Sequence, residues 1–202
     1  MVASTLALTS LVYVGLYFIG SIPTGYWFCK AFFNLDITTH GSGNIGATNV
    51  ARVLGSVRYF FLIFLIDAVK AYCGLAIASF ALGFWYSSLE IKNLLLLGAC
   101  MIFLGNAHSI FLRFKGGKGI ATLLGLVCYL LPAWLLGVFV MVWAGLLAAT
   151  RRMYIASLGG SFALVAAYWM YYYSSTDMLS YFLLNVFIFL VIRHKRNIFS
   201  SL

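Results

Sequence analysis

Two glycine-rich segments hold most of the side chains that could do chemistry in this chain. The first spans residues 40–52 and places three glycines within six residues. Glycine lets backbone N–H groups turn toward a ligand without obstruction by a Cβ atom. The segment therefore indicates an anion-binding loop that leads into a helix N-terminus, although a flexible polar linker would have a similar composition. Its candidate substrate-contacting residues are Gly41, Ser42, Gly43, Asn44, Gly46, Thr48, Asn49 and Arg52.

The second segment, residues 113–122, repeats this chemistry with more positive charge. Three glycines are interspersed with two lysines that lie three residues apart. A helix that begins directly after them would point its N–H groups and its positive dipole end at the same anion. The segment is not a Walker A loop, because the order Gly-x4-Gly-Lys-Ser/Thr is absent. Binding of anionic lipid headgroups is the alternative. The candidates are Lys115, Gly116, Gly117, Lys118 and Gly119.

Two further groups of polar residues add candidates. Residues 193–197 hold three cations together with His194 and Asn197, although an ordinary basic membrane anchor would look similar. Asp67 and Lys70 lie three residues apart inside an apolar segment, so they can face each other on a helix. Because charges inside a membrane are usually paired, this pair is either a structural ion pair or part of a substrate pocket.

Acidic and nucleophilic clusters are missing from the sequence. It has only four Asp and Glu residues, no Ser–His–Asp set and no HxxxxD acyltransferase motif. A magnesium-dependent phosphotransferase would need clustered carboxylates. The four cysteines stand singly in apolar segments, without metal-ligand spacing. We therefore predict no metal and no cofactor.

Transmembrane helices are the elements that must position these groups. Hydrophobic residues make up 64% of the 202 residues and charged residues 8%, whereas a soluble domain carries about 25% charged residues. Long apolar runs predict an all-α polytopic membrane protein and argue against a β-barrel of short alternating strands. The first run is interpreted as a retained span, because no basic residue precedes Lys30. The predicted spans are residues 6–28, 59–85, 93–111, 153–173 and 178–191, of which the last can extend into the basic tail.

One more apolar segment, residues 119–150, is too long for a single span. As one helix its 32 residues would measure about 48 Å, against a hydrocarbon core of about 30 Å. Pro132 favours a break near its middle. A break there puts eleven of the thirteen Lys and Arg residues on one face, which the positive-inside rule assigns to the cytoplasm. We predict about seven transmembrane helices in one integral-membrane domain, residues 1–202, with the N-terminus outside, the C-terminus cytoplasmic and short or broken helices around Pro132.

These motifs resemble those of the bacterial acyl-phosphate:glycerol-3-phosphate 1-O-acyltransferase family, and the match covers most of the chain. The resemblance is strongest in Gly-Ser-Gly-Asn-Ile-Gly-Ala-Thr-Asn-Val at residues 41–50 and in Phe-Lys-Gly-Gly-Lys-Gly at residues 114–119. The other matching positions are residues 20–25, Lys30, residues 36–37, 51–55 and 67–70, Arg193, His194 and Asn197.

The resemblance implies an enzyme of the bacterial inner membrane with its active site on the cytoplasmic face. Such an enzyme transfers a fatty acyl group from acyl phosphate to the 1-hydroxyl of sn-glycerol 3-phosphate, an early step of phospholipid biosynthesis. The products are lysophosphatidic acid and inorganic phosphate. The implied partners are these two substrates, membrane lipid and an enzyme that produces acyl phosphate, without nucleic acid. The implied catalytic residues are Ser42, Arg52, Lys118, His194 and Asn197.

Two departures from the family pattern stand out. The family usually has Gly-His-x-aromatic-Pro before Phe114, where this chain has Gly-Asn-Ala-His-Ser at residues 105–109. The Arg that commonly follows Asp-Ile is Thr38 here. These changes leave open a catalytically impaired member that binds lipid intermediates. A transporter or flippase for an organic phosphate is the other alternative, but it would need polar groups at both mouths, and the predicted outer loops are nearly featureless.

Overall fold

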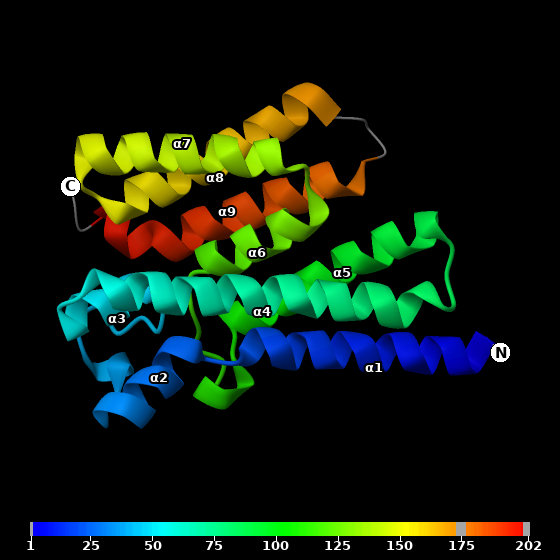
Figure 1. Cartoon of the computed structure of the whole chain (residues 1–202), viewed down its shortest axis with the longest axis horizontal. Coiled ribbons are helices and arrows are strands. Elements are labelled where there is room, and N and C mark those ends of the chain that lie inside the picture. Colours follow the sequence, from blue (N-terminus) through cyan, green and yellow to red (C-terminus); the bar gives the residue numbers. More distant parts are fainter. Residues whose placement is uncertain (1, 173–176, 200–202) are drawn as a thin grey trace. The chain divides into compact units, whose positions relative to one another are not determined.

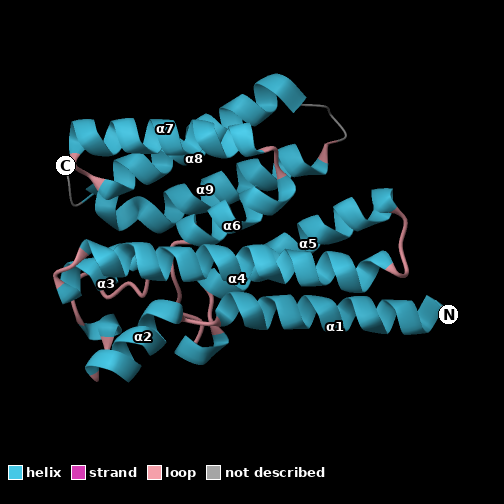
Figure 2. Ribbon diagram, viewed as in Figure 1, coloured by secondary structure: helices cyan, strands magenta, loops and turns pink. Residues whose placement is uncertain are grey.

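The chain is helical throughout the part that the structure describes. The computed structural model describes the backbone of residues 2–172 and 177–199, and Figure 2 shows helices and loops in these ranges. The all-α prediction is therefore confirmed. The helices are α1 (Val2–Ser21), α2 (Thr24–Phe33), α3 (Ala47–Leu54), α4 (Val57–Gly83), α5 (Ser88–Ala107), α6 (Ile120–Leu130), α7 (Ala133–Thr150), α8 (Met153–Tyr172) and α9 (Met178–Phe199), with short 3-10 turns η1 (Ile37–Thr39) and η2 (Ile110–Leu112).

Six of these helices are long and apolar enough to cross a membrane. They are α1, α4, α5, α7, α8 and α9. α6 is shorter, with 11 residues, which corresponds to about 16 Å at 1.5 Å per residue, or half of the hydrocarbon core. The predicted division of residues 119–150 is confirmed, because α6 ends at Leu130 and Pro132 is the N-cap of α7. α9 also extends into the basic tail as predicted.

The predicted first span, residues 6–28, is wrong in its second part. α1 stops at Ser21, and a separate helix of 10 residues, α2, begins at Thr24. The reason is Pro23, which has no N–H for the helical ladder and disfavours helical backbone at Ile22. The chain is thus broken at Ile22 and Pro23, and the Ile22 carbonyl accepts a hydrogen bond from Lys70 of α4.

The predicted span 93–111 is displaced toward the N-terminus in the structure. Ser87 and Glu90 form a capping box, which starts α5 five residues earlier than hydropathy alone suggests. α5 ends at Ala107, with His108 as its C-cap, so Phe111 lies in η2 instead of in the helix. The span predicted as 59–85 is shifted by two residues to α4, and α8 begins at the predicted residue 153.

The helices group into two compact units, one up to Tyr129 and one from Leu130 onward. In unit 1, α1 packs against α5 and α4, while α3 packs against the N-terminal part of α4. In unit 2, α8 lies between α7 and α9, as Figure 1 shows. Unit 1 carries both glycine-rich segments, and unit 2 carries the basic C-terminal residues.

Candidate active site

The first glycine-rich segment is ordered by one buried amide, Asn49. Its Oδ1 accepts the Ser42 N–H at 2.9 Å, and its Nδ2 donates to the carbonyls of His40 at 3.0 Å and Asn44 at 2.9 Å. Asn49 is only 2% exposed. Both N–H groups of this amide are therefore used within the loop, which wraps around the first turn of α3.

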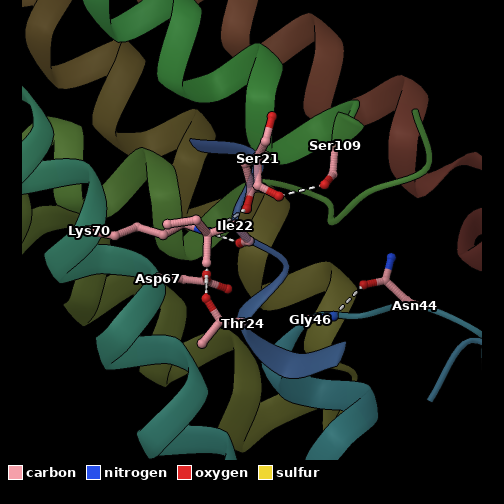
Figure 3. Close-up of polar contacts among 9 residues, drawn as sticks. Ser21, Ile22, Thr24, Asn44, Gly46, Asp67, Lys70 and Ser109 are labelled. Atoms are coloured by element: carbon pink, nitrogen blue, oxygen red, sulfur yellow. Dashed lines mark hydrogen bonds and ion pairs between the residues drawn. The ribbon is translucent and has the colours of Figure 1, made fainter. Parts of the chain in front are cut away.

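Two glycines in this loop adopt a backbone conformation that other residues rarely take. Gly41 and Gly43 have φ angles of 59° and 69°, in the left-handed region. Asn44 Oδ1 then accepts the Gly46 N–H at 2.8 Å, directly before α3 begins. Figure 3 shows this contact. The prediction that the loop runs into a helix N-terminus is confirmed.

The side chains that this scaffold presents to its surroundings are Ser42 and Arg52. Both residues are exposed, whereas Thr48 on the first turn of α3 is half-buried. Ser42 sits in the loop and Arg52 lies in the last turn of α3. The segment thus offers a hydroxyl, a guanidinium and a helix N-terminus, which are all groups that suit a phosphate.

A small capped turn leads into this loop. The Asp36 carboxylate accepts hydrogen bonds from the Thr38 hydroxyl at 2.6 Å and from the Thr38 N–H at 2.9 Å. These bonds, the hydroxyl first, lower the pKa of Asp36 below its ordinary value. The Asp36 carboxylate therefore contributes its full stabilisation of this turn at pH values above its ordinary pKa. The contribution is lost as the pH falls through the lowered pKa and the carboxylate is protonated. Thr38 thus completes the η1 turn.

The second glycine-rich segment folds back onto the end of α5. The Gly117 N–H donates to the Asn106 carbonyl at 2.9 Å. A Cβ atom on Gly116 would overlap with the carbonyl oxygens of Asn106 and Ala107. Close packing against α5 is therefore one reason for glycine at residue 116, beyond access to a ligand. Lys115 is exposed and Lys118 is half-buried.

The segment then opens α6, as the sequence predicts. Gly119 has a φ of 94°, and its carbonyl accepts the Leu123 N–H at 2.8 Å in the first turn of the helix. Lys118 thus directly precedes the N-terminal turn of a half-length helix. The N–H groups of that turn and the lysine ammonium are a suitable combination for binding phosphate.

Asp67 and Lys70 form a buried ion pair, with Lys70 Nζ 2.6 Å from Asp67 Oδ1. Asp67 Oδ1 also accepts the Thr24 hydroxyl at 2.8 Å, and Lys70 donates to the Ile22 carbonyl at 2.8 Å. Figure 3 shows these contacts around the break between α1 and α2. The pair predicted from the three-residue spacing is present, and it holds the helix break that hydropathy did not predict.

The remaining catalytic candidates, His194 and Asn197, lie in α9 of unit 2. His194 is 3% exposed, and its Nδ1 lies 2.8 Å from the Leu190 carbonyl. This contact fits an Nδ1–H that donates to the carbonyl and leaves the lone pair on Nε2. The side chain of Asn197 lies outside the described residues.

Comparison with known proteins decides the family. The sequence pattern of glycerol-3-phosphate acyltransferases matches residues 10–202. The chain belongs to the glycerol-3-phosphate acyltransferase family. It is 38% identical to the member from Fusobacterium nucleatum, over 90% of this chain and 88% of that protein. It is 36% identical to the member from Thermosipho melanesiensis, over 93% and 85% of the two chains.

Solved structures share the fold of this acyltransferase. The glycerol 3-phosphate form of PlsY (YgiH), an integral membrane glycerol 3-phosphate acyltransferase, aligns with a TM-score of 0.80 and 27% identity. The alignment covers 94% of this chain and 90% of that one. The lysophosphatidic acid form of the same protein aligns with a TM-score of 0.79 and 28% identity. This chain is therefore a multi-pass membrane enzyme that transfers acyl groups.

Sequence reasoning gave no role to several residues that the structure connects to the glycine loops. Asn106 and Ser109 are departures from the family pattern, and both are buried and hydrogen-bonded. Thr24 and the Ile22 carbonyl also bind the Asp67–Lys70 pair. The available signal was a polar residue, Asn106, at the end of an apolar span and directly before a glycine-rich segment.

Proposed function

We propose that this acyltransferase moves a fatty acyl group from acyl phosphate to the 1-hydroxyl of sn-glycerol 3-phosphate, forming lysophosphatidic acid and inorganic phosphate. Two ordered glycine loops that each open a helix and carry exposed or half-buried cations support this proposal. Both substrates bear phosphate, and such loops supply N–H groups and positive charge for phosphate. The solved relative is known in a glycerol 3-phosphate form and in a lysophosphatidic acid form, which correspond to the proposed acceptor and product.

In the proposed reaction the acceptor hydroxyl attacks the acyl carbonyl carbon. A new C–O ester bond forms, and the bond between the carbonyl carbon and the phosphate oxygen breaks. Inorganic phosphate leaves with the electron pair of that bond. Because phosphate is already a good leaving group, no acyl-enzyme intermediate is required. Holding the two substrates together supplies much of the rate.

Arg52 and Lys118 hold substrate phosphates and offset the charge that develops on the leaving phosphate. Ser42 and the N–H groups of the glycine loops orient the substrates or stabilise the tetrahedral oxyanion. The remaining glycine-loop residues, with Lys115, Asn44 and Thr48, complete the phosphate sites. The hydroxyl proton passes to a substrate phosphate oxygen or to His194. The roles of His194 and Asn197 in catalysis are proposed from the resemblance to the family.

We further propose that residues 1–202 form one acyltransferase domain in the cytoplasmic membrane of a bacterium, with the glycine loops facing the cytoplasm. There the enzyme takes up glycerol 3-phosphate from water and acyl phosphate from the lipid phase. It works beside an enzyme that produces acyl phosphate. The charge distribution supports this orientation.

An assay with purified protein in detergent tests the function. Acyl phosphate and glycerol 3-phosphate are supplied together and singly, and phosphate release and lipid product are measured. We expect turnover that requires both substrates. Arg52→Ala and Lys118→Ala should each lower kcat/KM by about 10²-fold or more, because each removes a cation at the reacting groups.

Lys92→Ala provides the matched control, since Lys92 is an exposed lysine in the first part of α5, near the α4–α5 turn. It should leave turnover unchanged. A folded protein without turnover would contradict the enzymatic proposal. Uptake of glycerol 3-phosphate into proteoliposomes without acyl transfer would instead favour a transporter.

A further inference from the structure

The ammonium of Lys70 joins three separate stretches of unit 1. Its Nζ lies 2.6 Å from Asp67 Oδ1, 2.8 Å from the Ile22 carbonyl and 3.5 Å from Asn106 Oδ1. An ammonium has three N–H donors, so these three acceptors account for all of them. The side chains of Lys70 and Asp67 are 9% and 13% exposed, so the charge is largely shielded from water.

Asn106 links this buried charge to the second glycine loop. Its side-chain oxygen faces Lys70, and its backbone carbonyl accepts the Gly117 N–H at 2.9 Å. The side chain also lies against the loop, because a Cβ atom on Gly117 would stand 3.2 Å from Asn106 Nδ2. One residue therefore contacts the ion pair through its side chain and the loop through both side chain and backbone.

Ser109 binds the segment after α5 to the end of α1, next to the helix break. Its hydroxyl donates to the Ser21 carbonyl at the end of α1, as Figure 3 shows, and Ser109 is 1% exposed. Asn106 and Ser109 occupy the two positions where the family usually has His and Pro. In this chain both positions hold small polar groups that bind the break after α1 or its ion pair.

We infer that Asn106 is a positioning residue, which transmits the location of the Asp67–Lys70 pair to the glycine loop at residues 116–119. The ammonium of Lys70 holds the side-chain oxygen of Asn106 in place. This contact fixes the side-chain amide and the backbone carbonyl of Asn106 against the loop. Lys118 and the first N–H groups of α6 then face a substrate phosphate with little freedom left to lose on binding. This inference rests on the proposed function of the loop.

Asn106→Leu tests the inference, because leucine has a similar size but offers no acceptor to Lys70. We expect KM for one phosphate substrate to rise about tenfold, which corresponds to roughly 1.4 kcal/mol of binding, while kcat stays within about twofold. Asn106→His, which restores an acceptor nitrogen, should recover the KM. The matched control is Asn93→Leu, an exposed asparagine in the first part of the same helix.

A double-mutant cycle shows whether Asn106 acts through the ion pair. The pair is replaced as a whole by Asp67→Leu and Lys70→Met, because removing one partner alone would leave a buried charge. In this background Asn106→Leu should change KM by less than about twofold. Additive effects, or a loss of thermal stability without any change in KM, would overturn the inference.

Hydrogen exchange of the substrate-free protein separates this inference from the proposed function. Peptides covering residues 113–122 should take up deuterium faster in Asn106→Leu than in the parent chain or in Asn93→Leu. This measurement needs no turnover, so it decides the positioning role even if acyl transfer is absent. Equal uptake in all three proteins would contradict it.

Discussion

Asn49 and Arg52 lie only three positions apart but have different roles in the candidate site. Asn49 is buried, and its side-chain amide forms hydrogen bonds with three backbone groups of the loop. Arg52 is exposed in the last turn of α3. The sequence predicted that both would contact substrate. The hydrogen bonds favour a role for Asn49 in shaping the loop, and we propose that Ser42 and Arg52 contact phosphate.

Asn49→Ala is expected to destabilise the loop as well as to lower activity. It removes three hydrogen bonds and leaves the Ser42 N–H and two carbonyls without that partner, which costs roughly 2–4 kcal/mol. The apparent midpoint of thermal unfolding in detergent should fall, while the exposed Asn93→Ala keeps its midpoint. Lost activity with an unchanged midpoint would show instead that Asn49 contacts substrate directly.

At the scale of elements, α6 owes its position to small residues and helix ends. A Cβ atom on Gly125 would overlap with the Ala68 carbonyl of α4, so the two helices approach more closely than a side chain would permit. The N-terminus of α6 follows the loop that is bound to the end of α5. The half-length helix α6 is thus held by its contact with α4 and by the loop that precedes it, and its N-terminus directly follows Lys118.

Gly125→Ala should therefore push α6 away from α4. We expect a loss of about 1–3 kcal/mol from overpacking, seen as a lower unfolding midpoint, and a higher KM because the helix N-terminus moves. Gly137→Ala in α7 is the matched control, since its Cβ atom would meet nothing within 4 Å. That variant should be neutral or slightly stabilising, because alanine favours helix. Equal losses in the two variants would refute the packing argument.

At the scale of the whole molecule, each unit carries its bases at one end. In unit 1 six bases lie in α2, in α3, in the first turn of α4 or between α5 and α6. Lys70 is paired with Asp67 inside α4, and Lys92 lies near Glu90 and the α4–α5 turn. In unit 2 the α7–α8 turn and the C-terminal end of α9 carry the bases, and both lie at the same end of that unit. The positive-inside rule predicts that these ends face the cytoplasm.

Reporter fusions test this orientation. Green fluorescent protein fused after Leu202 or after Gly55 should fluoresce, because both positions are predicted to be cytoplasmic. Alkaline phosphatase fused after Tyr86, in the α4–α5 turn, should be active because that turn is predicted to face the outside. The reverse pattern would contradict the proposed orientation and the cytoplasmic site.

The sequence alone determined the helical membrane class, the break at Pro132 and the two glycine loops that lead into helices. These features depend on composition, on the missing N–H of proline and on the freedom of glycine, all of which act over a few residues. Hydropathy did not predict the break at Ile22, because the chain is apolar both before and after this residue.

Only the tertiary structure decided where the polar side chains of this chain point. Lys70 meets Ile22 and Asn106, which lie 48 and 36 residues away in the chain. Asn49 and Asn106 have the same side chain, yet one orders a loop from within and the other joins a loop to an ion pair. A buried polar group takes whichever partners packing brings within reach, and packing joins residues that are far apart in sequence.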